Sequence, residues 1–505
     1  MSSNTSKTSN DGVVLAAGET GSAFFHRILK DAATKHAAVF DAAKLPTSSK
    51  AFKRTYGDAV SRFESARIGS ARRVELAQEL YDATVSSLNF AKDGVEVPLS
   101  ESLRNVKGVA PKTGERVGNT GSHGWTPELI LDGKTYRGVS EARVAVQKLH
   151  EAHHVSNAAA KGLNWLLDHC EKSGGTLSLR GQKFALLGAS AELSPISVLL
   201  GAGATVRWID VKPPGKAPWG DAVGSQGDAL GGKIISSEGG DDLLTNPHAV
   251  LAALREFAAD GPVHLGLFAY APGASRELRL AGVMNAMVNV LGPDVVKSVS
   301  FYISPTSPGE LQPEDLEVAA ARAKSPRLWQ RGFQATRMLR PGGHESITGA
   351  AVVRSVISLQ GAAYQAAQYL MKIIAGEVLA TRGLGGKPVT LSANVAGITN
   401  TRSLSHPLFQ IAFQGAPQFG VRIFEPLTTR SVSGMLMVHD LLNPDAPSAA
   451  GRTYASPAER AKASRTEQIH GGTYDLPWQF ESAVKTAAIL GLGKRPDLLV
   501  RRPRR

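Results

Sequence analysis

Apolar residues in the first part of the chain recur every three or four positions, which is the spacing of amphipathic helices. The pattern is strongest over residues 23–43 and 70–91, and it predicts a mainly helical segment from Gly21 to about Val95. The same spacing returns over residues 140–175, where a Gly-Gly pair is a typical helix stop.

The stretch between these helical segments carries turn residues instead. Residues 105–124 are rich in glycine and polar side chains, and we expect a loop there. Residues 127–138, PELILDGKTYRG, place Asp-Gly between two short apolar runs, which predicts a β-hairpin.

From Gly181 onward, short apolar runs alternate with helical stretches. Alternation of buried-type strands with helices predicts a parallel sheet that is covered on both faces. The expected strands are KFALLG (183–188), ATVRWID (204–210), GKIISS (232–237), HLGLFAYAPG (264–273), VKSVSFYIS (296–304) and PVTLSANVAG (388–397).

These patterns divide the chain into four parts. We expect a disordered tail over 1–20, a mainly helical N-terminal region over 21–178, a doubly wound α/β domain over 179–444, and a linker with a C-terminal helical tail over 445–505.

The composition is that of an ordinary globular chain, with 42% hydrophobic and 20% charged residues among 505. No apolar run approaches the ~20 residues of a membrane span, so we expect no membrane partner. The N-terminus lacks the layout of a signal peptide. The single cysteine, Cys170, leaves no disulfide framework and no thiolate zinc site. We therefore expect a cytoplasmic protein.

The net charge of +13 is spread along the chain, apart from the basic residues 501–505. No zinc finger, RNP-like aromatic pattern or basic amphipathic helix accompanies this charge, so we expect no nucleic-acid partner. A basic protein that binds an anionic cofactor has the same balance. We expect a small-molecule or acyl-type substrate and a homo-oligomer.

The stretch from Lys183 to Asp210 resembles a nucleotide-binding unit in its layout. Its first strand ends in Gly188, Ser190 follows, and a helix is expected to begin near Leu193 to Pro195, where free N–H groups attract phosphate. Asp210 ends the next strand and can accept the ribose hydroxyls. Glu192 stands where a glycine usually closes the pattern, and its carboxylate repels a pyrophosphate unless it turns away.

Further candidate cofactor-binding positions follow the other strands. Asp242 can hold an adenine amino group, Ala271 and Gly273 lie beside a ribose, and Thr399 and Thr401 can meet a carboxamide. Ser304 ends the fifth strand, and Tyr364 lies at the start of a long helix.

Six segments within about residues 181–444 follow one another along the chain: GASAEL, DLLTNPHAV, YAPG, SFYIS, YQAAQYLMKIIAGEVLA and NVAGITNTRSL. In this order they resemble landmarks of the short-chain dehydrogenase/reductases. The resemblance implies a Rossmann-like doubly wound sheet and NAD(P)-dependent hydride transfer to or from a carbonyl or an activated alkene.

The resemblance also implies residue roles. Tyr364 would donate the proton, Lys372 would be its electrostatic partner, and Ser304 would orient the substrate. Asp210 favours NAD because an acid there repels a 2′-phosphate. The nearby cations Lys212 and Arg207 could instead favour NADP, so the expected cofactor is NAD or NADP.

One departure from the family concerns the lysine. Gln368 stands one turn after Tyr364, where the family has its lysine, and Lys372 follows two turns on, about 12 Å along the helix axis. A second register pairs Tyr369 with Lys372, one turn apart. Enoyl reductases related to this family have wider spacings, so the resemblance points towards that branch, with residues 305–349 as an inserted lid.

Two other functions stay open. Glu192 and Gln368 also fit a non-catalytic Rossmann-fold binding or regulatory protein that has lost the Tyr-Lys chemistry. A methyltransferase would also use an acid after the second strand, although the tyrosine-bearing helix speaks against it. Asn285 lies where the family keeps a structural or proton-relay asparagine. The histidines of residues 150–154 lack a visible third ligand, and we expect no metal site.

Overall fold

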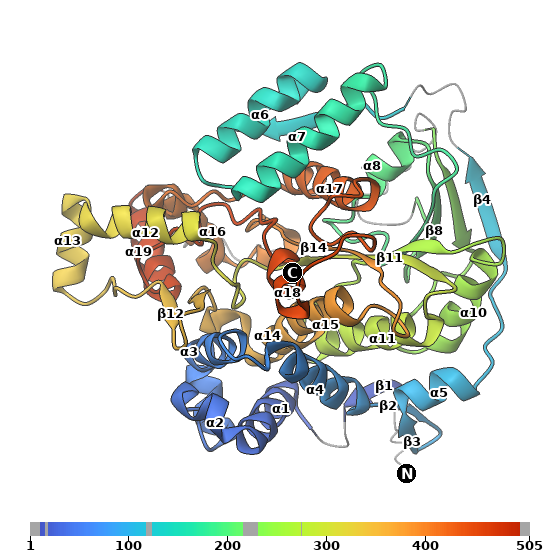
Figure 1. Ribbon diagram of the computed structural model, residues 1–505, viewed down its shortest axis with the longest axis horizontal. Coiled ribbons are helices and arrows are strands. Elements are labelled where there is room, and N and C mark those ends of the chain that lie inside the picture. The colour runs from blue at the N-terminus through green and yellow to red at the C-terminus, as the bar shows by residue number, and fades with distance from the viewer. Residues whose placement is uncertain (1–10, 16–18, 118–123, 216–230, 274, 495–505) are drawn as a thin grey trace, which may run out of the picture.

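The computed structural model describes residues 11–15, 19–117, 124–215, 231–273 and 275–494. Its centre is a seven-stranded sheet (Figure 1). Neighbouring strands are parallel, except that β4 pairs antiparallel with β9. In spatial order the strands are β14 (Thr390–Val395), β11 (Val296–Ile303), β10 (Val263–Leu267), β7 (Lys183–Leu187), β8 (Thr205–Ile209), β9 (Lys233–Ser237) and β4 (Thr113–Val117). The expected α/β class with a mostly parallel sheet is confirmed.

Helices cover both faces of this sheet (Figure 1). Side chains alternate between the faces along a strand, and in β7 Ala185 and Leu187 join one core while Phe184 and Leu186 join another. This two-sided burial explains why the strand is an unbroken apolar run. Helices on the first side are α10 (Pro247–Phe257), α11 (Arg276–Leu291), α14 (Ala362–Gln368) and α15 (Ala375–Arg382); those on the second are α6 (Val139–Glu151), α7 (Asn157–Lys172), α8 (Ile196–Gly201) and α17 (Pro426–Leu442).

The N-terminal region packs against the first helical layer, and one hydrophobic core runs from its helices to the sheet. Its helices are α1 (Gly21–Lys35), α2 (Ala37–Phe40), η1 (Asp41–Ala43), α3 (Ser49–Ile68), α4 (Arg73–Ser86) and α5 (Leu99–Asn105). A small antiparallel sheet joins β1 (Gly12–Leu15), β2 (Leu88–Lys92) and β3 (Val95–Pro98). The mainly helical character expected for 21–95 is present.

Two expectations for this half of the chain are wrong. Within the expected disordered tail 1–20, β1 is an ordered strand, because Val13 and Leu15 bury their side chains in the core; residues 1–10 and 16–18 lie outside the described part. The expected loop 105–124 contains the edge strand β4, whose exposed residues carry no apolar alternation to reveal it. The Asp-Gly hairpin is confirmed as β5 (Glu128–Leu131) and β6 (Lys134–Arg137).

A third hydrophobic core joins the expected lid to the C-terminal segment. The lid, residues 305–349, carries α12 (Pro313–Lys324), α13 (Leu328–Ala335) and β12 (His344–Ser346). It is followed by β13 (Ala351–Val353), which pairs with β12, and by η2 (Ser358–Gln360). The later elements are η4 (Arg402–Leu404), α16 (Pro407–Gly415), η5 (Ala416–Phe419), α18 (Pro457–Ala463) and α19 (Phe480–Lys494).

The described part of the expected linker and tail is built into the fold. Residues 467–478 are buried, and Gln468 forms a parallel bridge with Val395 at the end of β14. The loop-like composition of this segment concealed its burial. Among the described residues, no helix is both long enough and apolar enough to cross a membrane.

Candidate functional site

Several of the predicted site residues lie at the carboxyl end of the parallel strands. Along the chain, β7, β8 and β9 are added in one direction and β10, β11 and β14 in the other, so the order reverses between β7 and β10. Ligands of open α/β sheets bind at such a reversal. Gly188 lies at this point with φ +84°, and a Cβ there would come within 2.2 Å of the Ala269 backbone. Only glycine fits this position.

The turn after Gly188 is held by Asp210. One carboxylate oxygen, Oδ2, accepts hydrogen bonds from the Ser190 backbone N–H at 3.0 Å and from its hydroxyl at 2.7 Å. Among the described residues, the other oxygen, Oδ1, has only a long contact of 3.4 Å, with the backbone N–H of Lys212. Asp210 therefore braces the turn and keeps one oxygen able to accept a ligand hydroxyl. The helix that follows, α8, begins at Ile196.

The side chain of Glu192 points away from the turn after Gly188. Its carboxylate accepts a hydrogen bond from the backbone N–H of Arg402 at 3.0 Å, and Arg430 donates to its backbone carbonyl at 3.0 Å. Arg402 belongs to the loop after β14. The residue that interrupts the glycine pattern therefore ties the turn to the threonine-bearing loop.

Two predicted ligands use their polar groups within the protein. Asp242 accepts from the backbone N–H groups of Leu244 and Thr245, at 2.8 and 3.2 Å. The Thr399 hydroxyl is buried and bonds to the Gly397 carbonyl and to Thr429.

Other predicted residues stay at the edge of the crevice. Thr401 is half-buried, and its hydroxyl lies 3.0 Å from that of Ser403. Ala271 and Gly273 lie in the loop after β10, where the Ala271 backbone N–H donates to Glu277 at 3.2 Å.

Ser304 and Tyr364 meet at the end of β11. The Tyr364 hydroxyl lies close enough to the Ser304 side chain for the serine to favour the ionised tyrosine. Burial raises the pKa of Tyr364 above its ordinary value, and the interaction with Ser304 offsets only part of the rise. Gln368 does not replace the lysine chemically, because its side chain accepts the Ser304 backbone N–H at 3.2 Å and so holds the serine in place.

A π turn, η3 (Tyr369–Ile374), interrupts the helix between Tyr364 and Lys372. In a regular helix of 3.6 residues per turn, residues eight positions apart differ in direction by about 80°. The wider π turn takes up extra residues per turn and offsets part of this rotation. Lys372 and Tyr364 both interact electrostatically with the buried Glu277, as expected of side chains that share one side of the helix.

Side chains from other elements hold the π turn open. Asn285 donates to the Met371 carbonyl at 3.0 Å, and Arg465 donates to the Ile373 carbonyl at 3.2 Å. Such partners compensate helix carbonyls whose regular bonding is disturbed. Asn285 therefore has a structural role in the geometry of the helix that carries Tyr364.

Sequence reasoning missed two residues of this group, Glu277 and Tyr270. Glu277 is buried at the start of α11, and burial raises its pKa to about 7, against the opposing effect of Lys372. Tyr270 follows β10 and bonds to Ser403. The signal was present in FAYAPGASRE, a strand tip that carries a tyrosine and an acid together.

Tyr369 lies elsewhere. Its hydroxyl donates to Glu64 at 2.7 Å inside the N-terminal region, and its side chain is fully buried. The structure therefore brings Ser304, Tyr364 and Lys372 to one side and separates Tyr369 from them, so the second register is not the one that this fold presents.

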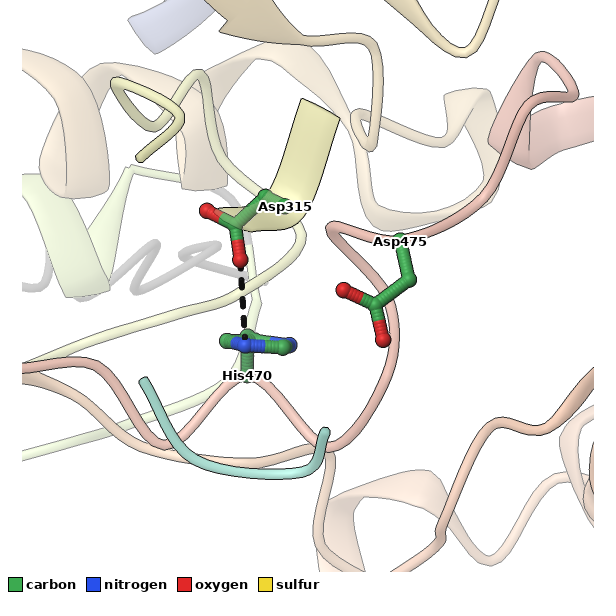
Figure 2. Close-up of side chains that lie close together, drawn as sticks. All are labelled: Asp315, His470 and Asp475. Carbon is green, nitrogen blue, oxygen red and sulfur yellow. Dashed lines mark ion pairs between the residues drawn. The ribbon is translucent and has the colours of Figure 1, made fainter. Parts of the chain in front are cut away.

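Among the described residues, two buried groups have the composition of a metal site. They are Asp315, His470 and Asp475 (Figure 2), and His439, Asp440 and Glu467. In the first, the Gly472 backbone N–H donates to His470 Nδ1 at 3.1 Å. The ring proton is therefore on Nε2, which points to Asp315 at 3.4 Å.

The second group has the same property. The Asp445 backbone N–H donates to Asn443 Oδ1, so the amide nitrogen of Asn443 faces His439 Nε2, at 2.9 Å. The His439 proton is then on Nδ1, which faces Asp440 at 3.1 Å. In both groups the nitrogen that faces the acids carries a proton instead of a free lone pair. The second group is held by hydrogen bonds, whereas in the first the buried carboxylate oxygens of Asp475 have no hydrogen-bond partner among the described residues. The histidines of residues 150–154 belong to neither group.

The first cluster predicts a pH dependence of stability. Burial raises the pKa of Asp315 to about 8 and that of Asp475 to about 7, although Arg322 lowers the latter in part. The unfolded value is ~3.9, so the folded protein binds these protons more tightly. Their contribution to stability is full below the unfolded pKa and is lost as the pH rises through the folded values.

We expect Asp475→Asn to flatten the decline in the free energy of unfolding between about pH 4 and pH 7, because the amide cannot ionise. Urea unfolding at several pH values measures this decline. Asp294→Asn, on an exposed turn, is the control and should leave it unchanged. Equal slopes for Asp475→Asn and the unmodified protein would contradict the prediction.

Comparison with protein-family models, with curated proteins and with solved structures finds no match for this chain.

Proposed function

We propose that this protein is an NAD(P)-dependent oxidoreductase of the short-chain type, which transfers hydride to or from a carbonyl or an activated alkene. The observation that carries the proposal is that the side chains of Ser304 and Tyr364 lie next to each other at the carboxyl end of β11, while Tyr364 and Lys372 both interact with the buried Glu277. A serine and a tyrosine that lie next to each other can both bind one substrate oxygen.

The strand order supports a Rossmann-like cofactor crevice. Numbered along the chain, the six parallel strands lie in the order 3-2-1-4-5-6, which is that of dinucleotide-binding sheets. The residues fit a dinucleotide in part: Gly188 keeps the crevice free of a side chain, one Asp210 oxygen accepts only a long bond of 3.4 Å, and the Glu192 side chain faces away. The side chains of Asp242 and Thr399 form hydrogen bonds within the protein. Thr401 is therefore the better candidate to bind the nicotinamide end of the cofactor.

The bound cofactor would supply or accept a hydride, with its two electrons. In reduction, Ser304 would hold the substrate oxygen and Tyr364 would donate a proton to the reduced substrate. The positive charge of Lys372 would stabilise the tyrosinate that remains. Glu277, buried near both, would keep Lys372 charged despite its partial burial. Oxidation would reverse the proton transfer.

The second candidate is the non-catalytic binding protein on the same fold. Asp210, Asp242 and Thr399 all bond within the protein, and the pKa of Tyr364 is raised, so each of these groups also fits a site without chemistry. Such a protein would bind a nucleotide without turnover.

A fluorescence titration with NADH and NADPH tests the proposal. We expect one cofactor to bind and Asp210→Ala to weaken it about 10- to 150-fold, the loss of one hydrogen bond to a charged group. Asp210→Asn removes the charge but keeps a side chain that can support the turn, so it distinguishes these two roles of Asp210. Asp294→Ala, at an exposed position, is the control. Absence of binding by both cofactors would overturn the proposed function.

A further inference from the structure

A narrow apolar cavity of about 50 Å³ lies between the two helices α16 and α19. Its lining includes Phe409 and Phe413 from α16 and Phe480 and Ala487 from α19, and the other lining residues are apolar except Thr306 and Gln360. The walls come from the third hydrophobic core, in which the C-terminal segment packs against residues that follow β14. The segment expected to be a tail therefore builds a binding space.

The two polar lining residues connect this cavity to the catalytic group. The Thr306 hydroxyl lies 2.8 Å from that of Ser304 and donates to Gln360 Oε1 at 2.9 Å. Leu404, in the loop after β14, also lines the cavity. One end of the cavity is thus polar and next to Ser304, and the remainder offers no hydrogen-bonding side chain.

We propose that this cavity binds a straight apolar chain of the substrate, with the reacting carbonyl or alkene held at Ser304 and Tyr364. The inference rests on the proposed function and narrows its substrate to short-chain aliphatic aldehydes, ketones or enals. A single water-sized group needs about 10–15 Å³ of such a cavity. The cavity therefore accepts a chain of about four carbon atoms without any movement of its walls. A longer chain requires Phe413 to move, since it forms the wall to a neighbouring polar cavity of about 360 Å³.

Straight-chain alcohols and aldehydes of increasing length test this proposal. Binding is followed by thermal shift without cofactor, and by nicotinamide absorbance with NADPH or NADP⁺ and with NADH or NAD⁺. We expect affinity to rise about fourfold per methylene, the value for burying one such group, up to a chain of about four carbons, and then to level off.

Two substitutions act on the cavity in opposite directions. Ala487→Leu fills it and should abolish the dependence on chain length, while Ala488→Leu, one position on in α19 and outside the lining, should preserve it. Phe413→Ala widens the cavity and should move the plateau to longer chains. It keeps the proposal testable if Ala487→Leu does not fold.

The outcomes separate this inference from the proposed function. Cofactor binding without any dependence on chain length would overturn the cavity assignment and leave the oxidoreductase standing. Dependence on chain length without cofactor binding would support the cavity and overturn the oxidoreductase. If the dependence of affinity on ligand length were unchanged in both Ala487→Leu and Phe413→Ala, the aliphatic part of the ligand would bind elsewhere, and the assignment would be overturned.

Discussion

Glu377→Ala is expected to lower the free energy of unfolding by about 3–5 kcal/mol, the cost of leaving one positive charge of a buried ionic network uncompensated. Glu377 has no exposed side-chain surface, and its carboxylate pairs with Arg67 at 2.8 Å, Arg73 at 3.0 Å and Arg465 at 2.7 Å. Burial alone would raise the pKa of Glu377, but these three arginines hold it well below its usual range.

The loss is large because this network joins three distant parts of the chain. Arg67 and Arg73 belong to the N-terminal region, Glu377 to α15, and Arg465 to the C-terminal segment. Arg67 has no exposed side-chain surface either, and Glu64 would remain as its carboxylate partner among the described residues.

Urea unfolding measures the effect, with Glu75→Ala as the control. Glu75 pairs with Arg72 at the surface at 2.8 Å, and such an exposed pair contributes about 0–1 kcal/mol. Equal losses for the two variants would show that the buried network does not stabilise the fold more than a surface pair does.

Tyr364→Phe is expected to reduce turnover by about 10²- to 10⁴-fold, the usual contribution of a positioned general acid. The change removes only the hydroxyl that lies next to Ser304, so cofactor affinity should stay the same. The rate of reduced-nicotinamide oxidation with the aldehydes described above measures turnover, and the fluorescence titration measures cofactor binding.

Tyr369→Phe is the matched control on the same helix. Its hydroxyl bonds to Glu64 within the buried ionic network, so the change should affect stability and leave turnover intact. A loss of turnover in Tyr369→Phe, with Tyr364→Phe fully active, would reverse the assignment of the two tyrosines. Full activity in both would remove tyrosine from the proposed mechanism.

Local patterns along the chain determined much of the architecture. The six expected runs after Gly181 became the six parallel strands, because strands that are buried on both faces are mostly apolar, even though they include buried polar residues such as Arg207 and Ser298. The Asp-Gly pair set the β5–β6 hairpin through backbone φ values of 53° at Asp132 and 74° at Gly133. The polar residues at the strand ends could be placed at one edge, because parallel strands end together.

Tertiary structure alone decided which of these residues form the site. The direction of Glu192, the commitment of Asp242 and Thr399 to internal bonds, and the π turn that rotates Lys372 each depend on a partner or a geometry that no local spacing encodes. The choice between Tyr364 and Tyr369 depends on Ser304 and Glu64, which are distant in sequence. Burial is likewise a property of the whole fold, and so the polar C-terminal segment, predicted as a linker, became part of the core.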